Sequence, residues 1–243
     1  MPTLYLVALD HHRLDDPLFL QSLAQHIQKA LPHAPTCILV HGSGEKLDRT
    51  LEAQGVFVER TDAGVLPPET PEQAQLVERA VRETNQAIVG TLTDEVVPAV
   101  GIQGVDRGLL QTGADGALTT GRLGWLEALL KQHVLPVVSA LAPQKGTRHA
   151  QEVPVADAVL ALAEGLADAF TCHPTAFTTT GRPGVMDATG TRSEAGLDAV
   201  SADTVPERGL VQRALDRGFT PLVTSPGGLF DPSGPSGTRI QAA

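Results

Sequence analysis

Aromatic residues, cysteines and basic residues are all scarce in this chain of 243 residues. Aromatic side chains make up 3% of it, and 18 lysines and arginines face 28 aspartates and glutamates, which gives a net charge of −10. Nucleic acids and anionic membrane surfaces favour clustered Lys and Arg, so we expect neither as a partner. Two cysteines, Cys37 and Cys172, are too few for a disulfide framework and favour a reducing cytoplasm.

Long apolar runs are missing as well. No stretch approaches the roughly 18 apolar residues of a membrane span, and the first residues lack a charged and then apolar signal peptide. Hydrophobic residues still make up 42% of the chain, which excludes a disordered protein. We therefore expect one large α/β domain or two small lobes with a substantial core.

Short apolar segments alternate with helical patterns along the chain. Residues 4–9 and 37–40 predict buried strands, each followed by a polar or glycine-rich loop and then a helix, the first beginning at Asp16 and Pro17. Further helices are expected over 71–92, 123–133, 154–167 and 206–217, with Gly218 ending the last, and further strands over 96–102, 108–111, 135–140, 170–172, 177–180 and 220–224. Residues 190–203 are expected to form a loop and residues 225–243 a loosely ordered tail. This alternation is typical of a parallel sheet covered by helices on both faces.

Six short motifs then follow one another in a recognisable order. They are residues 38–44 (ILVHGSG), 99–108 (AVGIQGVDRG), 135–138 (LPVV), 155–157 (VAD), 183–185 (PGV) and 237–240 (GTRI). Together they resemble the amino acid kinase family, in particular the acetylglutamate kinases and the related aminoadipate kinases, with Ser43 in place of one glycine of a His-Gly-Gly-Gly motif. The resemblance implies an open αβα sandwich with a mainly parallel central sheet, as in carbamate kinase-like folds. It also implies a substrate-type half over 1–145 and a shortened nucleotide-type half over 146–243, within one structural domain.

The resemblance implies transfer of the γ-phosphoryl group of ATP, with Mg²⁺, to a carboxylate, as in arginine or lysine biosynthesis. Such catalysis is mostly charge stabilisation by lysines and backbone N–H groups. Asp157 is similar to the residue that organises the two lysines. His41, Gly42, Ser43, Gly44, Gly101 and Gly104 match the glycine-rich turns that would cradle an anion.

The charged residues that this reaction needs are replaced. Where the first strand should end in a lysine followed by two glycines, the chain has Ala8, Leu9, Asp10 and His11. The second lysine falls on Glu207, with Arg208 beside it as a substitute. The substrate arginine falls on Leu66, and the substrate asparagine on Val155. An active enzyme would need another cation at the phosphates in place of the missing lysines, and Arg13 and Arg107 are two further candidates.

These changes predict a catalytically degenerate kinase-like protein that acts as a small-molecule-binding or regulatory subunit. The alternative is an active ATP-dependent kinase for an N-acylated amino acid. ATP and Mg²⁺ are expected as cofactors only if nucleotide binding is retained, and whether the chain is an enzyme stays open. The expected partners are a small carboxylate ligand, an active kinase relative, and a second copy of this chain. The resemblance suggests that this copy docks along the apolar stripe of the 71–92 helix, although the same stripe would equally cover the sheet.

A metal site is the remaining alternative for the polar loops. His11, His12 and His41 follow strands that should end at the same sheet edge, with Asp10 and Asp157 nearby. Imidazole and carboxylate ligands suit zinc-like ions. Drifted surface residues explain the same pattern, and we assign no metal from the sequence.

Overall fold

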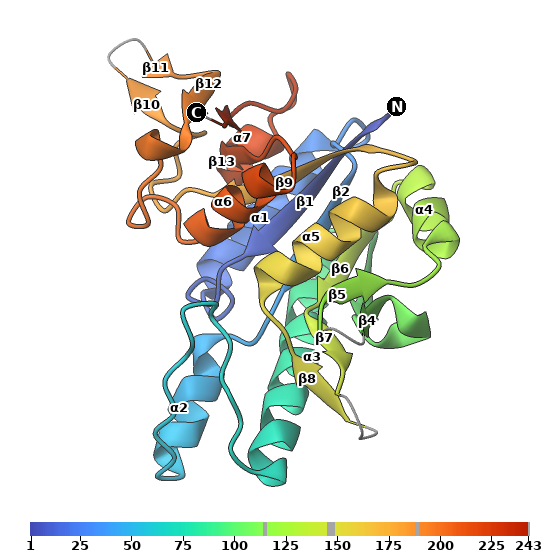
Figure 1. The fold of residues 1–243 in the computed structure, drawn as a ribbon. Helices are drawn as coiled ribbons and strands as arrows, with labels where there is room; N and C mark the ends of the chain where they lie inside the picture. The colour runs from blue at the N-terminus through green and yellow to red at the C-terminus, as the bar shows by residue number, and fades with distance from the viewer. Residues whose placement is uncertain (114–115, 145–148, 188–189, 243) are drawn as a thin grey trace.

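The central element of the computed structural model is a sheet of eight strands among residues 1–113, 116–144, 149–187 and 190–242, which the structure describes (Figure 1). In spatial order the strands are β12 (Glu194–Gly196), β14 (Thr238–Gln241), β13 (Leu222–Thr224), β9 (Thr171–Phe177), β1 (Thr3–Leu9), β2 (Cys37–His41), β6 (Leu135–Ser139) and β3 (Ala99–Gln103). Every pairing is parallel except β13 with β14. The predicted open αβα sandwich with a mainly parallel sheet is confirmed.

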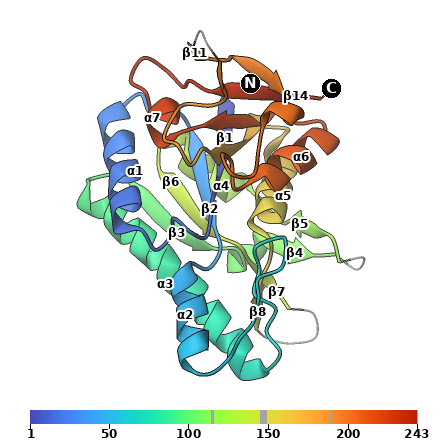
Figure 2. The same cartoon turned by 90° about the vertical axis from the view of Figure 1, so that its left-hand side faces the viewer.

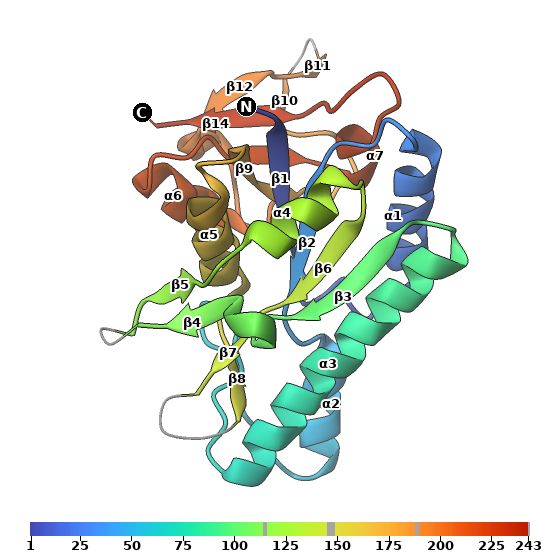
Figure 3. The same cartoon turned by 90° about the vertical axis from the view of Figure 1, so that its right-hand side faces the viewer.

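Helices cover both faces of the sheet because its strands alternate their side chains. Leu6 and Ala8 of β1 pack into one core with α4 (Gly124–Lys131), α5 (Val155–Leu166) and α6 (Arg208–Asp216). Val7 and Leu9 face the opposite core, which holds α1 (Pro17–Ala30), α3 (Pro71–Asp94) and α7 (Pro226–Leu229). Figures 2 and 3 show the two layers on either side of the strands.

Helix boundaries follow the local signals. The Asp16 side chain accepts hydrogen bonds from the N–H groups of Leu18 and Phe19 at 2.9 and 3.3 Å, and Pro17 opens α1. Gly218, with φ of 78°, lies just past α6, as predicted. α2 (Glu45–Ala53) follows the glycine-rich loop after β2.

The carboxyl ends of β1 and β2 lie side by side, since Leu9 pairs with His41. The loops that carry Asp10 to Arg13 and Gly42 to Gly44 therefore meet at this end of the sheet. Beyond it extend α2, part of α3 and two hairpins, β4 (Leu110–Thr112) with β5 (Leu118–Thr120) and β7 (Leu141–Pro143) with β8 (Ala150–Glu152) (Figure 1). In sheets of this kind, ligands bind outside the carboxyl ends of the strands.

Several local predictions were wrong. The two strands expected at 170–172 and 177–180 are one continuous strand, β9, and the expected strand at 96–102 begins only at Ala99. The loop at 190–203 contains β12, the short β11 (Gly190–Thr191, paired with Met186–Asp187 as β10) and a 3₁₀ turn over Leu197–Ala199. The tail is ordered in its described part, where α7 and β14 complete the core and the sheet. Thr238 and Ile240 are fully buried.

The apolar stripe of α3 packs against other elements of the same chain. Val77 packs with Leu47 and Leu51 of α2, Val81 packs with Leu141, and Ile88 and Leu92 join the core beneath the sheet. The stripe therefore covers the protein's own core rather than offering an apolar face to a second copy. Dimerisation through this helix stays a prediction that needs other surfaces of α3.

Two further expectations concern the division of the chain into two halves and the lack of a membrane span. The boundary between the expected halves at 145/146 lies outside the described residues. Among the described helices, none combines the length and the apolar character needed to cross a bilayer.

Candidate functional site

A cavity of about 420 Å³ lies at the carboxyl end of β1, against the first turns of α5 and α6. Its titratable lining residues, among those that the structure describes, are Asp10, His11, His12, Asp62, Asp203, Glu207 and Arg213. A smaller neighbouring cavity shares His11 and Glu207 and reaches Ser43 and Glu152. Among the described residues of the main cavity wall, four carboxylates thus accompany one arginine.

Asp10 and Glu207 make this cavity acidic. The Asp10 side chain is 5% exposed, and its Oδ2 lies 3.2 Å from Arg13 Nε, while its Oδ1 has no hydrogen-bond partner among the described residues. Burial, reinforced by the nearby Asp10 charge, raises the pKa of Glu207 to about 7, against a smaller opposing effect of Arg213. Arg13 also donates to the Thr178 carbonyl at 2.6 Å, so its guanidinium is held at the strand ends.

Asp157 lies in the first turn of α5 and is paired, but not with Arg208. Arg213 Nη1 of α6 lies 2.6 Å from Asp157 Oδ1, and both side chains are about one-third exposed. Arg208 instead donates to the Val200 carbonyl at 2.7 Å. The structure therefore gives Arg213, and not the expected Arg208, the position beside Asp157. Arg107 lies over the ring of Trp125, with its Cζ 5.4 Å from the ring centroid.

The glycine-rich loop after β2 is occupied by carboxylates of the chain itself. Glu152 accepts hydrogen bonds from the backbone N–H and the hydroxyl of Ser43, at 2.5 and 3.0 Å. At the start of α2 the Lys46 N–H donates to Asp15 Oδ2. A Cβ at Gly42 would collide with Glu152, and one at Gly44 with the Asp15 carboxylate, so the glycines make room for these two groups. The N–H groups of Ser43 and Lys46, at the place where the sequence predicts an anion cradle, thus have internal acceptors.

Arg60 completes the surroundings of Glu152. Its guanidinium donates to Ser43 Oγ at 3.1 Å and to Asp48 Oδ2 at 2.9 Å. Burial raises the pKa of Glu152, and the Ser43 hydrogen bonds and the Arg60 charge oppose that shift. Glu152, Arg60 and Asp48 form a largely buried polar cluster next to the glycine-rich loop after β2.

His41 is a core residue rather than a ligand at the strand ends. It is fully buried, its Nδ1 lies 2.8 Å from the Gly42 carbonyl, and Asn85 Nδ2 approaches its Nε2 at 3.0 Å. Burial lowers the pKa of His41 to about 4, so the ring is neutral, with Nδ1 donating and Nε2 accepting. Gly101 belongs to the same unit, because a Cβ there would collide with Asn85 Oδ1.

The other expected positions are packing residues. Gly104 lies against the Ser139 and Leu141 carbonyls, where a side chain would not fit, so Gly101 and Gly104 serve close packing instead of an anion cradle. Ala8 is buried in the core beneath α5, and Leu66 is buried with Leu47 and Leu51. Val155, the first residue of α5, lines the smaller cavity.

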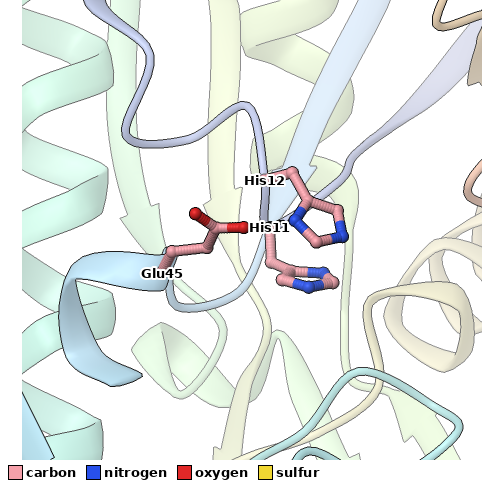
Figure 4. Close-up of side chains that lie close together, drawn as sticks. All are labelled: His11, His12 and Glu45. Carbon is pink, nitrogen blue, oxygen red and sulfur yellow. Dashed lines mark hydrogen bonds and ion pairs between the residues drawn. The ribbon is translucent and has the colours of Figure 1, made fainter. Parts of the chain in front are cut away.

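The expected histidine grouping is only half correct. His11 and His12 lie together, with ring centroids 3.9 Å apart, but their third neighbour is Glu45, the first residue of α2, and not the buried His41 (Figure 4). His12 Nδ1 contacts Glu45 Oε1. Asp157 is engaged by Arg213 and is not part of this group.

Sequence reasoning missed the residues that contribute from distant segments. Glu152, Arg60, Asn85, Arg213 and Glu45 carried no motif of their own. The position of Arg213 was one signal that could have identified it. It lies on α6, the next helix after α5, which carries Asp157, and the two helices pack together. The polar Asn85 inside the apolar stripe of α3 was a second signal, since a buried amide needs hydrogen-bond partners.

Curated relatives match the chain over part of its length. Acetylglutamate kinase of Chloroflexus aggregans is 31% identical over 153 residues, which covers 58% of this chain and 58% of that relative. Acetylglutamate kinase of Deinococcus radiodurans is 35% identical over 112 residues, or 43% of each chain. The matches thus span about half the length of these relatives. No protein-family model matches the chain.

Solved structures match the whole fold at low identity. N-acetylglutamate synthase from Neisseria gonorrhoeae, complexed with coenzyme A and N-acetyl-glutamate, superposes with a TM-score of 0.71 at 16% identity, over 98% of this chain and 59% of that one. Isopentenyl phosphate kinase superposes with a TM-score of 0.64 at 16% identity, over 98% and 100% of the two chains. These likenesses establish the fold.

The fold is therefore that of the amino acid kinases and carbamate kinase-like proteins. Over about half of its length the chain is similar to acetylglutamate kinases, in agreement with the resemblance of its motifs.

Proposed function

We propose that this acetylglutamate kinase-like chain is catalytically degenerate and acts as a small-molecule-binding or regulatory protein. The observation that carries the proposal is that carboxylates of the chain itself fill the expected anion cradle, which we call the filled cradle. Glu152 accepts hydrogen bonds from Ser43, and Asp15 accepts one at the start of α2. A phosphate would have to displace a carboxylate that the chain holds by its own hydrogen bonds. The residues present therefore do not fit the phosphates of ATP.

The charge of the cavity supports the same conclusion. Phosphoryl transfer concentrates negative charge, which the family stabilises with cations and N–H donors. Here Asp10 and Glu207 occupy the positions that the resemblance assigns to the end of the first strand and to the second lysine. Loss of one preorganised donor typically costs about 2.7–4 kcal/mol, or 10²–10³ in rate. Loss of both lysines, with Glu207 in place of the second and Asp10 added two residues after the first, reduces catalysis further.

The same lining defines the ligand that we expect. Asp10, Asp203 and Glu207 line a cavity in which Arg213, the one arginine among its described wall residues, is already paired to Asp157. A small molecule with an amino group or another cationic centre fits this charge better than a simple carboxylate does. A regulatory role, through an active kinase relative or a second copy of this chain, is part of the proposal. The free, buried Cys37 and Cys172 fit a reducing cytoplasm.

A second candidate is an active ATP-dependent kinase for the carboxylate of an N-acylated amino acid, with ATP and Mg²⁺ as its cofactors. The observation that favours it is Arg213, a cation that reaches the cavity from α6 beside Asp157. In this case Arg213 would replace a missing lysine. Asp157→Asn would then abolish turnover without unfolding the protein.

Thermal-shift titrations of the chain with MgATP, MgADP and N-acetylglutamate, singly and together, test the proposal. Ligands that bind the folded state raise the melting temperature in a saturable way. We expect no saturable rise with either nucleotide and a rise with a small amino compound drawn from a panel. A saturable rise with MgATP would contradict the proposal and favour the second candidate.

A further inference from the structure

We propose that His11, His12 and Glu45 form a binding site for a divalent metal ion of the zinc class. Each offers one ligand atom, and these atoms all lie within 4.8 Å of one another. In Figure 4 the two imidazole rings lie beside each other, and the Glu45 carboxylate points toward them. This inference concerns a different group of residues from the filled cradle and does not depend on the loss of nucleotide binding.

The sheet brings the three residues together from separate segments. His11 and His12 lie in the turn after β1, and Glu45 opens α2 directly after the loop that follows β2. Because β1 and β2 pair in parallel, with Leu9 opposite His41, the two segments leave the sheet as neighbours. The pairing of β1 with β2 therefore brings the two ligand-bearing segments close together.

The donor set selects the class of metal. Two imidazoles and one carboxylate suit Zn²⁺ and similar transition metals, whereas Mg²⁺ and Ca²⁺ prefer oxygen ligands alone. Three protein ligands also leave a coordination position for water or another ligand, which is the composition of reactive rather than purely structural zinc sites. His12 and Glu45 are 61% and 43% exposed, so an ion can enter from solution.

Asp10 supplies an independent observation next to this group. Its side chain is buried, and its Oδ1 has no hydrogen-bond donor among the described residues. Asp10 lines the same cavity wall as His11 and His12. A buried carboxylate oxygen without a partner is unfavourable, and an adjacent metal ion with its bound water supplies both the positive charge and a donor. Asp10 thus has the chemistry of a residue that supports the metal from outside its ligand set.

The position of the site suggests its use. His11 and His12 line the 420 Å³ cavity, whose other charged side chains are mainly carboxylates. A bound divalent ion adds positive charge there and gives the cavity a point of attachment for an anionic or neutral oxygen of a ligand. The metal would thereby extend the range of ligands beyond amines.

Equilibrium dialysis of the chelator-treated full chain, expressed without a histidine tag, measures the site directly. With Zn²⁺ we expect one strongly bound ion per chain and no competition from millimolar-range Mg²⁺. Co²⁺ should give the intense visible absorption of a site with few ligands. The variant His12→Ala/Glu45→Gln should weaken Zn²⁺ binding by roughly tenfold or more.

A matched control keeps the test decisive. The variant His33→Ala/Glu52→Gln removes the same two residue types at exposed positions outside the cluster. It should bind Zn²⁺ like the parent chain. Circular dichroism checks that both variants fold. Equal loss in the two variants, no loss in His12→Ala/Glu45→Gln, or absence of Zn²⁺ binding by the parent chain would each overturn the proposal.

Discussion

The Glu152 carboxylate accepts hydrogen bonds from both the backbone N–H and the hydroxyl of Ser43, at 2.5 and 3.0 Å. The pair joins the hairpin strand β8 to the glycine-rich loop after β2. It places an internal anion at donors that the motif would otherwise offer to a ligand. Much of the functional interpretation follows from this one contact and from the matching role of Asp15 at α2.

Replacement of Glu152 should expose the cradle. Glu152→Ala leaves the N–H and the hydroxyl of Ser43 without their acceptor, so we expect a loss of about 1–3 kcal/mol in the free energy of unfolding. The vacated donors should then accept an external anion, and inorganic phosphate should raise the melting temperature of the variant more than that of the parent. Ser43→Ala, which keeps the N–H, should not show the phosphate effect. Equal phosphate responses of Glu152→Ala and the parent chain would contradict the filled cradle.

Asp157 should be energetically coupled to Arg213 and not to Arg208. The Asp157–Arg213 pair is partly exposed, so a double-mutant cycle with Asp157→Asn and Arg213→Ala should give a coupling of about 0.2–1 kcal/mol. The cycle with Arg208→Ala should give a coupling near zero, because Arg208 bonds to the Val200 carbonyl. Urea unfolding measures both. A larger coupling with Arg208 than with Arg213 would show that the assignment is wrong.

Glu207 should make stability fall as the pH rises toward neutrality. Its pKa is raised to about 7 in the folded chain, so the folded state binds more protons than the unfolded state above the ordinary glutamate value of 4.5. The protonated form therefore stabilises the fold below that value, and this contribution is lost between about pH 4.5 and 7. Relative to the parent chain, Glu207→Gln should gain on the order of 2 kcal/mol across this window and nothing further above it.

Unfolding measured at several pH values for both chains isolates this effect, because the other titrating groups are common to them. A difference between the two chains that does not change with pH would contradict the assignment.

Gly101 should be required for packing and not for binding. A methyl group at Gly101 would collide with Asn85, which holds His41, and overpacking of this kind typically costs about 1–3 kcal/mol. Gly90, within α3, has open space where a Cβ would lie. Gly90→Ala should stabilise the chain by about 0.5–1 kcal/mol, since alanine favours helix. Thermal unfolding of the two variants compares them, and a Gly101→Ala chain as stable as the parent would rule out the packing role.

Local patterns predicted the strands and helices that build the sheet. The apolar runs at β1 and β2 and the Asp16–Pro17 helix start are each encoded by neighbouring residues, so the sequence was sufficient there. The end of the chain was harder to predict, because Thr238 and Ile240 are buried in β14, which pairs with β12 and β13 from other parts of the sequence. The composition, rich in Gly, Pro and Ser, predicted a loosely ordered tail, whereas the resemblance of residues 237–240 to the family's final strand agrees with β14.

The candidate site was predicted less well because its contacts are non-local. The rule that parallel strand ends meet predicted that His11, His12 and His41 lie together; the structure has His11 and His12 together, but His41 is buried in the core. Glu152 approaches Ser43 from 109 residues further along the chain, which no local pattern encodes. Arg208 was selected by counting along the sequence, whereas the direction of each side chain around α6 brings Arg213 to Asp157.

A phosphoryl-transfer assay tests the central claim most directly. The chain is incubated with MgATP and N-acetylglutamate, and any acyl phosphate is trapped by hydroxylamine as a hydroxamate, with Asp157→Asn measured in parallel. The filled cradle and acidic cavity predict no product above the background without protein. Hydroxamate formed by the parent chain and abolished in a folded Asp157→Asn chain would contradict the account and establish an active kinase.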